Sequence, residues 1–116
     1  MKALIFSLIL LINPNDYENY LKKGDEFHKI FDNKNAVLQY EKAYGIAPGN
    51  YEVILKLTSA YNDLGEEYVE LSRRSESNNY REEAKKYIDK AVHYAEIFHR
   101  KFPDSADVYT YLALSY

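Results

Sequence analysis

The apolar residues of this chain return at intervals of three and four along most of its length, and this spacing limits the fold to helices. Between Tyr17 and Phe31 they alternate with lysine, aspartate and glutamate, and a second run extends from Val37 to Ala47. A period of 3.6 residues places such positions on one face of an α-helix. The "DNKN" of residues 32–35 favours a turn and a helix cap, and Pro48 with Gly49 ends the second run. The sequence therefore predicts an all-α fold that begins with two antiparallel helices.

The next apolar run is longer than an ordinary helix of a small domain. It steps by threes and fours from Ile54 to Leu71 and passes through Gly65 without a break. The polar "SESNN" at 75–79 has strong turn preference, and a second run of similar length covers 80–102. We expect two long helices, 51–74 and 80–102, joined at this turn.

The positions of small, aromatic and proline residues in these helices follow the pattern of an internal sequence repeat. If a 34-residue unit begins at Tyr17, small, aromatic and proline residues stand where the tetratricopeptide repeat has them. These residues are Tyr20, Gly24, Phe27, Ala36, Tyr40, Ala43 and Pro48, and Lys23 is the one departure, at a position that is usually apolar. The pattern makes physical sense, because small residues let two helices approach closely while aromatic rings fill the remaining space. The chain thus resembles the tetratricopeptide repeat family.

The resemblance implies a solenoid of about two and a half repeats. The units would be 17–50, an elongated 51–105 and an incomplete 106–116, since Pro103 closes the second unit 55 residues after Pro48 (103 − 48). The stretched second repeat is similar to bacterial relatives of the regulator-of-microtubule-dynamics proteins. The tetratricopeptide accessory component of substrate-capturing transporters is the alternative resemblance, although this chain lacks the lipidation cysteine of that component.

The two ends of the sequence carry predictions of their own. Residues 1–16 contain an apolar run after Lys2 that is typical of a signal peptide or an N-terminal anchor, and ten helical residues cover only about 15 Å of a hydrocarbon core near 30 Å. We therefore expect export to the periplasm or cell envelope if this segment acts as a signal, and a cytoplasmic protein otherwise, with no further membrane span. Residues 108–116 carry no charge, which predicts either a fragment of a longer repeat protein or self-association through 106–116.

Composition excludes several functional classes. A net charge of −3 and the absence of a lysine or arginine cluster argue against a nucleic-acid partner, and the absence of cysteine removes thiolate chemistry. No phosphate-binding glycine loop or nucleophile motif occurs. His93, Glu96 and His99 spread around a helix and do not converge on a metal. His28 could act as a general base oriented by Asp25, but no nucleophile is placed with them. We expect no enzyme activity, no cofactor and no metal.

The family resemblance implies a concave groove lined by the first helix of each repeat. The groove residues would be Leu21, Asp25, His28 and Lys29 from the first repeat, and Leu55, Ser59, Asn62 and Asp63 from the second. In the carboxylate-binding subgroup of the family, lysine and asparagine stand where this chain has Leu21 and Asp25, so a partner with basic or amide groups fits better. The alternative interpretation is that these residues are solvated helix faces.

The resulting functional prediction is a non-catalytic scaffold or adaptor that binds a peptide or protein segment in its groove. The alternatives are an accessory component of a substrate-capturing transport system and a structural scaffold that assembles through its uncharged C-terminal helix. Most of the 13 tyrosines lie on the apolar faces, where core packing accounts for them. Tyr44, Tyr51, Tyr94 and Tyr111 are the candidates for surface contacts.

Overall fold

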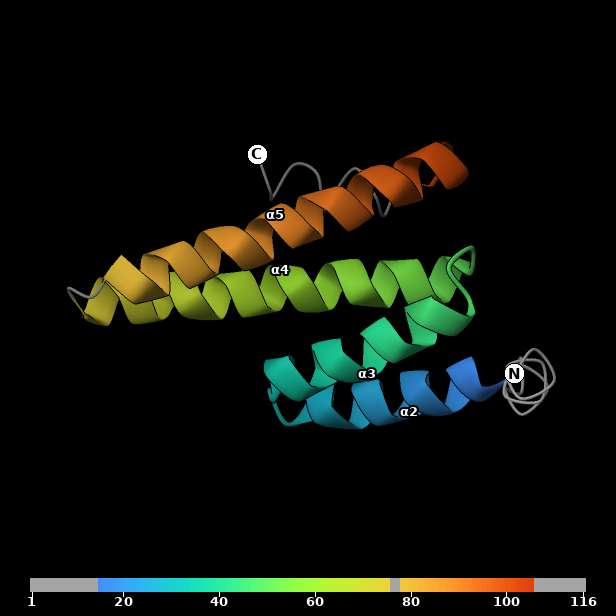
Figure 1. Ribbon diagram of the computed structural model, residues 1–116, viewed down its shortest axis with the longest axis horizontal. Helices are drawn as coiled ribbons and strands as arrows, with labels where there is room; N and C mark the ends of the chain where they lie inside the picture. Colours follow the sequence, from blue (N-terminus) through green and yellow to red (C-terminus); the bar gives the residue numbers. More distant parts are fainter. Residues whose placement is uncertain (1–14, 76–77, 106–116) are drawn as a thin grey trace, which may run out of the picture.

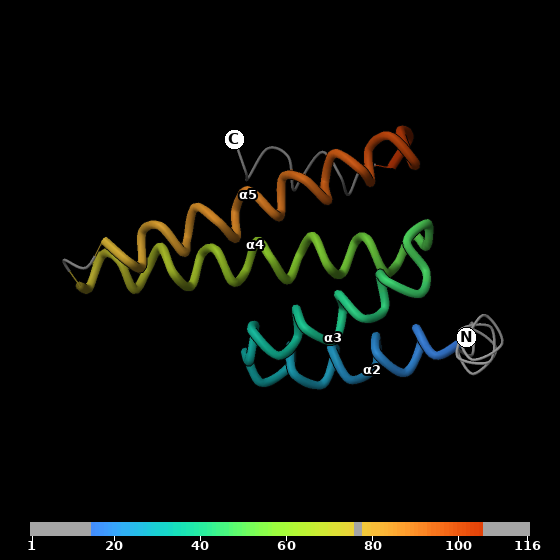
Figure 2. Tube along the Cα trace, in the orientation of Figure 1, coloured from blue at the N-terminus to red at the C-terminus, as the bar shows by residue number. Residues whose placement is uncertain are grey.

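The protein is built from antiparallel helices that follow one another in space as they do in sequence. The computed structural model describes residues 15–75 and 78–105, and no strand occurs among them. The helices are α2 (Asp16–Lys29), α3 (Asn33–Ile46), α4 (Tyr51–Arg74) and α5 (Asn78–Lys101). In Figure 1 they lie one above the other from α2 at the bottom to α5 at the top, and the tube in Figure 2 shows each reversing the direction of the one before. The all-α prediction is confirmed.

The long helices follow the sequence-based expectation closely. α4 continues through Gly65 to Arg74, and α5 begins at Asn78. The "DNKN" segment supplies a helix cap, as the sequence predicts: the carboxylate of Asp32 accepts a hydrogen bond from the backbone N–H of Asn35 at 3.3 Å and caps α3. Residues 33–35 form the first turn of that helix. The predictions for 1–14 and 106–116 lie outside the described residues.

α4 is the central helix of the core. It contributes a run of side chains with at most 1% exposure, including Val53, Ile54, Leu57 and Leu64, and it packs against both α3 and α5. The side chain of Asn50 caps its N-terminus by accepting from the N–H of Val53 at 3.1 Å. Burying this apolar row is the main stabilising contribution, at roughly 25 cal/mol for each Å² removed from water. α4 therefore holds the other helices in place.

Two glycines permit close contacts between neighbouring helices. A Cβ on Gly24 of α2 would overlap the ring of Tyr40 on α3, and a Cβ on Gly65 of α4 would lie 2.6 Å from Cγ1 of Ile88 on α5. Ala36 and Ala43 of α3 are fully buried, so small residues also line the α3 side of the core. The close approach of α2 and α3 at Gly24 is as predicted, and Ala36 is buried.

The ends of α4 and α5 that meet at residues 75–78 extend past the α2–α3 pair (Figure 1). No residue in 66–74 or 78–83 is buried. The two helices meet there through Tyr68, whose ring centroid lies 6.0 Å from that of Tyr80 and 5.3 Å from that of Tyr87. The overhang is held by these contacts between its own two helices, and α3 adds contacts at its base, because Asn33 donates to Glu67 and Lys34 lies over the Tyr68 ring. Among the described helices, none combines the length and the apolar character needed to cross a membrane.

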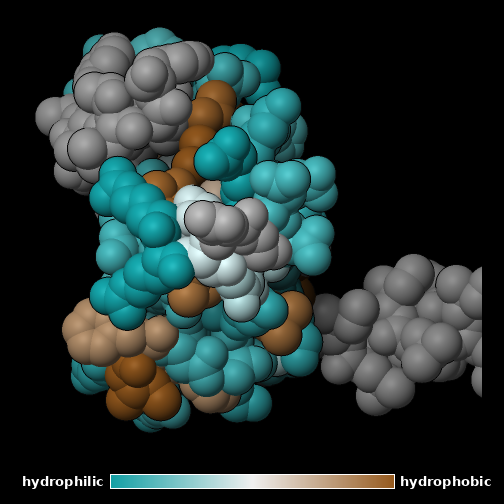
Figure 3. All heavy atoms as spheres, turned by 90° about the vertical axis from the view of Figure 1, so that its left-hand side faces the viewer, coloured by the Kyte–Doolittle hydropathy of each residue, from teal (hydrophilic) through white to brown (hydrophobic). Residues whose placement is uncertain are grey.

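The turn between α2 and α3 presents apolar side chains to solvent. Asp32 N–H donates to the carbonyl of Phe27 and Phe31 N–H donates to that of His28, which is the Schellman arrangement. Phe31 has φ 59°, in the left-handed region that usually requires glycine, and it is 84% exposed beside Ile30 at 70%. Figure 3 looks onto this end of the molecule and shows apolar side chains gathered over the α2–α3 corner.

Replacing Gly24 by alanine tests the helix contact. Gly24→Ala should lower the free energy of unfolding by about 1–3 kcal/mol, because the new methyl group must displace the Tyr40 ring. Gly45→Ala is the matched control: nothing lies within 4 Å of its Cβ position, so it should raise stability by about 0.5–1 kcal/mol. Urea denaturation measures both, and equal effects of the two substitutions would contradict the packing described here.

Replacing Phe31 by glycine tests the strained turn. Phe31→Gly should raise the free energy of unfolding by about 1 kcal/mol, since glycine adopts positive φ without a steric penalty and little apolar contact is lost. Ile30→Gly is the control, because Ile30 has φ −100° and gains nothing from glycine. A Phe31→Gly protein that melts below the parent would show that the ring stabilises the turn.

Candidate functional site

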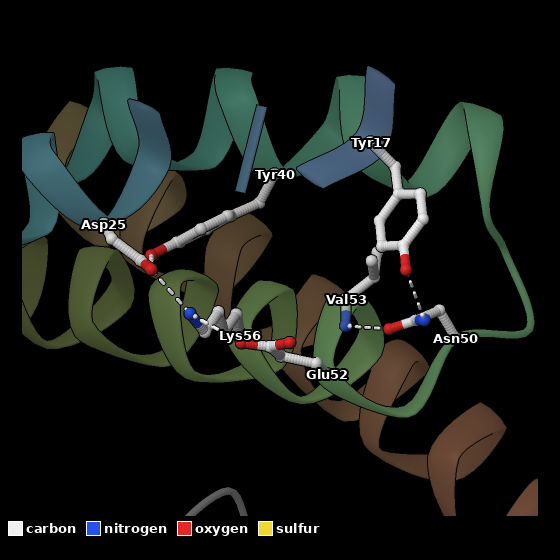
Figure 4. Close-up of polar contacts among 7 residues, drawn as sticks. All are labelled: Tyr17, Asp25, Tyr40, Asn50, Glu52, Val53 and Lys56. Atoms are coloured by element: carbon white, nitrogen blue, oxygen red, sulfur yellow. Dashed lines mark hydrogen bonds and ion pairs between the residues drawn. The ribbon is translucent and has the colours of Figure 1, made fainter. Parts of the chain in front are cut away.

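The first helices of the two pairs, α2 and α4, are joined by polar side chains. His28 Nε2 lies 2.8 Å from Asp63 Oδ2, and Lys56 Nζ donates to Asp25 Oδ2 at 2.6 Å. Lys56 also contacts Glu52 at 3.0 Å, one turn earlier on its own helix. Figure 4 shows Lys56 between the two carboxylates, with Asp25 reaching it from α2. These pairs fix the register of α2 against α4.

Asp25 is the centre of this network. Its second oxygen accepts a hydrogen bond from the hydroxyl of Tyr40 at 2.6 Å, so one carboxylate links α2, α3 and α4 (Figure 4). Burial and then the hydrogen bond to Asp25 raise the pKa of Tyr40 above its usual range. Burial by itself would lower the pKa of Lys56, but the hydrogen bonds to Asp25 and Glu52 outweigh it and raise that pKa. Tyr40 therefore stays neutral and Lys56 charged near neutral pH.

Two adjoining cavities lie along this α2–α4 face. The first, of about 230 Å³, is lined by Asp25, His28, Tyr40, Lys56 and Ser59. The second, of about 400 Å³, is lined by His28, Phe31, Asn33, Asp63, Glu66 and Glu67. His28 borders both, so the two cavities adjoin along this face, and the second reaches the exposed Phe31. We call this pair of cavities the α2–α4 groove.

The groove carries an excess of negative charge toward its Phe31 end. Glu66 accepts from the amide of Asn62 at 3.5 Å and Glu67 from that of Asn33 at 3.3 Å, but neither has a cation within 4 Å among the described residues. Both glutamates are exposed. A positively charged group that approached this end would therefore meet carboxylates not already neutralised by an ion pair.

Half of the groove residues expected from the sequence line the cavities. Asp25, His28, Ser59 and Asp63 do so. Lys29 is exposed and borders neither cavity.

The remaining expectations need correction. Leu21, 5% exposed, belongs to the hydrophobic core, and Asn62, 7% exposed, is buried on α4, so neither offers a surface to a partner. Leu55 is half-buried against the cluster of Ile54 and Phe98.

The expected roles of the two aspartates also change. Asp25 and Asp63 are held by Lys56 and His28, whereas the sequence reasoning left them free to pair with a partner. The sequence suggested His28 as a general base oriented by Asp25. This contact is not formed, because His28 bonds Asp63 instead. No group of three or more His, Asp or Glu side chains in the described ranges could hold a metal ion.

Sequence reasoning missed Lys56, Phe31, Glu66 and Glu67. Lys56 had a local signal, since Glu52 stands one helical turn before it. Phe31 also had one: α2 ends in "KIFDN", with an aromatic residue where a helix C-terminus commonly has glycine. The pair Glu66–Glu67 had none, because only the packing of α2 against α4 places these side chains beside the α2–α3 turn.

A row of tyrosine rings runs along the other side of α4, between it and α5. Neighbouring centroids are 5.1 Å apart for Tyr44 and Tyr94, 5.7 Å for Tyr94 and Tyr61, and 6.3 Å for Tyr61 and Tyr87. The hydroxyls of Tyr61 and Tyr94 both donate to Glu41 Oε1 of α3, at 3.0 and 2.9 Å. The expectation that Tyr94 is a surface residue is wrong: it is 7% exposed and lies in the core.

Comparison with known proteins adds no relative: no family model, no curated protein and no solved structure matches this chain. The functional argument therefore rests on the geometry of the chain itself.

The buried tyrosines predict a steep loss of stability at alkaline pH. Burial first, then the carboxylates of Asp25 and Glu41, raises the pKa values of Tyr40, Tyr61 and Tyr94 above the ordinary value near 10. Below about pH 10 both the folded and unfolded states keep these protons; above it only the unfolded state loses them, so the folded state is disfavoured. Between about pH 9 and pH 11 the free energy of unfolding should fall by about 4 kcal/mol in total, or about 1.4 for each tyrosine, with the steepest slope above about pH 10.

Urea denaturation between about pH 9 and pH 11 measures this slope. Tyr61→Phe should reduce it by the contribution of one tyrosine, since phenylalanine has no proton to lose. Parallel pH profiles for the parent and Tyr61→Phe would contradict the assignment.

Proposed function

We propose that this chain is a protein-interaction module that binds a basic segment of a partner along the α2–α4 face. The observation that carries the proposal is the groove on this face, which ends in Glu66 and Glu67 beside the exposed ring of Phe31. A partner segment with lysine or arginine next to an apolar side chain would complement it.

The repeat arrangement is part of the proposal. α2–α3 and α4–α5 are interpreted as two tetratricopeptide-like units, the second elongated. The contact of Gly24 with Tyr40, the burial of Ala36 and Ala43 and the end of α3 just before Pro48 support this interpretation. In such a solenoid the first helix of each pair faces the ligand, and here those helices are α2 and α4.

The strained turn supports a binding role for Phe31. An aromatic residue at φ 59° costs the fold about 1–2 kcal/mol relative to glycine, and its ring gains little burial in return. Strain of this kind is concentrated at functional positions, where the side chain serves something other than stability. Phe31 is the apolar anchor of the proposed groove.

Selection from a displayed random-peptide library, with the full chain as bait, tests the proposal. Enriched peptides should carry arginine or lysine beside an aromatic or aliphatic residue. The Glu66→Gln, Glu67→Gln double variant should bind a selected peptide about tenfold or more weakly, because the uncompensated carboxylates are gone, and the binding of the parent should weaken with salt. Fluorescence anisotropy measures the affinities.

The matched control is the Glu26→Gln, Glu82→Gln double variant. It removes the same charge from exposed positions that line neither cavity of the groove, and it should bind as the parent does. Enrichment of acidic peptides, or equal affinities of the two double variants, would overturn the proposal.

A further inference from the structure

A separate cavity lies on the side of the molecule formed by α3 and α5. It has a volume of about 330 Å³ and an apolar lining of Val37, Leu38, Tyr61, Leu64 and Tyr87. α3 and α5 form its walls and α4 its floor, while α2 contributes nothing. Leu38 is 56% exposed, so part of this apolar surface is open to solvent. The cavity is therefore distinct from the α2–α4 groove.

Three lysines complete the lining of the cavity: Lys34 from α3, and Lys86 and Lys90 from α5. Each ammonium lies over a tyrosine ring. The distances to the ring centroid are 5.5 Å for Lys34 over Tyr68, 5.4 Å for Lys86 over Tyr87 and 5.9 Å for Lys90 over Tyr61. None of the three has a carboxylate within 4 Å in the part of the chain that the structure describes. Cation–π contacts orient these charges without neutralising them.

The lining of the cavity contains three lysines and no aspartate or glutamate. The neighbouring Glu41, which does not line the cavity, accepts hydrogen bonds from the hydroxyls of Tyr61 and Tyr94. Lys86 and Lys90 also border a shallow hollow on α5 with Asp89 and His93. The side chains that line the cavity therefore carry three positive charges and no negative one, although the whole chain has a net charge of −3.

We propose that this cavity binds a small organic anion with a flat apolar body, such as an aromatic carboxylate. The flat body would lie against Leu38, Leu64 and Tyr87, and the carboxylate would take charge-assisted hydrogen bonds from the lysines. An apolar cavity of about 150 Å³ holds benzene, so the volume of this one suits a body of two fused rings. A mainly apolar lining with a few convergent charged groups is the usual composition of a small-molecule site.

2-Naphthoate is the probe, and its neutral analogue 2-naphthylmethanol is the control ligand. Titration of the ¹⁵N-labelled full chain, followed by amide chemical shifts, should move Leu38, Leu64 and Tyr87 with naphthoate and leave them nearly unchanged with the alcohol. The Lys86→Gln, Lys90→Gln variant should bind naphthoate about tenfold more weakly, because charge-assisted hydrogen bonds are lost.

The Lys22→Gln, Lys85→Gln variant removes the same charge from exposed positions outside the cavity, and it should bind as the parent does. Circular dichroism establishes that each variant is folded. The proposal is overturned if naphthoate leaves the three amides in place, if the alcohol binds equally well, or if the control variant loses as much affinity as Lys86→Gln, Lys90→Gln.

Discussion

Tyr40 links the three helices on which the rest of the structure depends. Its ring lies against Gly24, where any larger residue would force α2 away, and its hydroxyl donates to Asp25, which in turn holds Lys56 of α4. One buried side chain therefore sets both the separation of α2 from α3 and the register of α2 against α4. A buried hydroxyl without a partner would cost about 1–3 kcal/mol, so the ring position and the polar network depend on each other. The groove on the α2–α4 face is a consequence, because Asp25 and His28 can line it only at this register.

The charges of the molecule are divided between two faces. The α2–α4 face collects carboxylates, and those of Glu66 and Glu67 are not neutralised by an ion pair in the described ranges. The α3–α5 face collects lysines over tyrosine rings, and no carboxylate lines the cavity between these helices. A small net charge therefore conceals two local fields of opposite sign, and each field would select a different partner. The two proposals made here, a basic segment on one face and a small organic anion on the other, follow from this separation and can fail independently.

Much of the secondary structure could be predicted from the sequence because local signals agreed with one another. The spacing of apolar residues predicted that α4 continues through Gly65. The polar run after Arg74 indicated the turn before α5, and Pro48 with Gly49 indicated the end of α3. At "DNKN" the sequence favoured both a turn and a helix cap, and the capping hydrogen bond of Asp32 sets where α3 begins. The position of Tyr94 was predicted wrongly. A tyrosine on the flank of a helix is buried only when another helix covers it. Here the hydroxyl of Tyr94 donates to the carboxylate of Glu41 on α3.

The sequence by itself determined the helices, their approximate ends and the close contact at Gly24, because each depends on residues within a few turns or on a size that only glycine has. Only the tertiary structure decided which polar residues share a surface. His28 bonds Asp63, 35 positions away, and Glu67 lies near Phe31, because of how α2 packs against α4. A difference of a fraction of a turn in the orientation of a helix decides whether a side chain lies in solvent or in the core, and Leu21 and Asn62 lie in the core. Periodicity identifies the buried face of each helix, but the angle at which two helices meet is set by side chains far apart in the sequence.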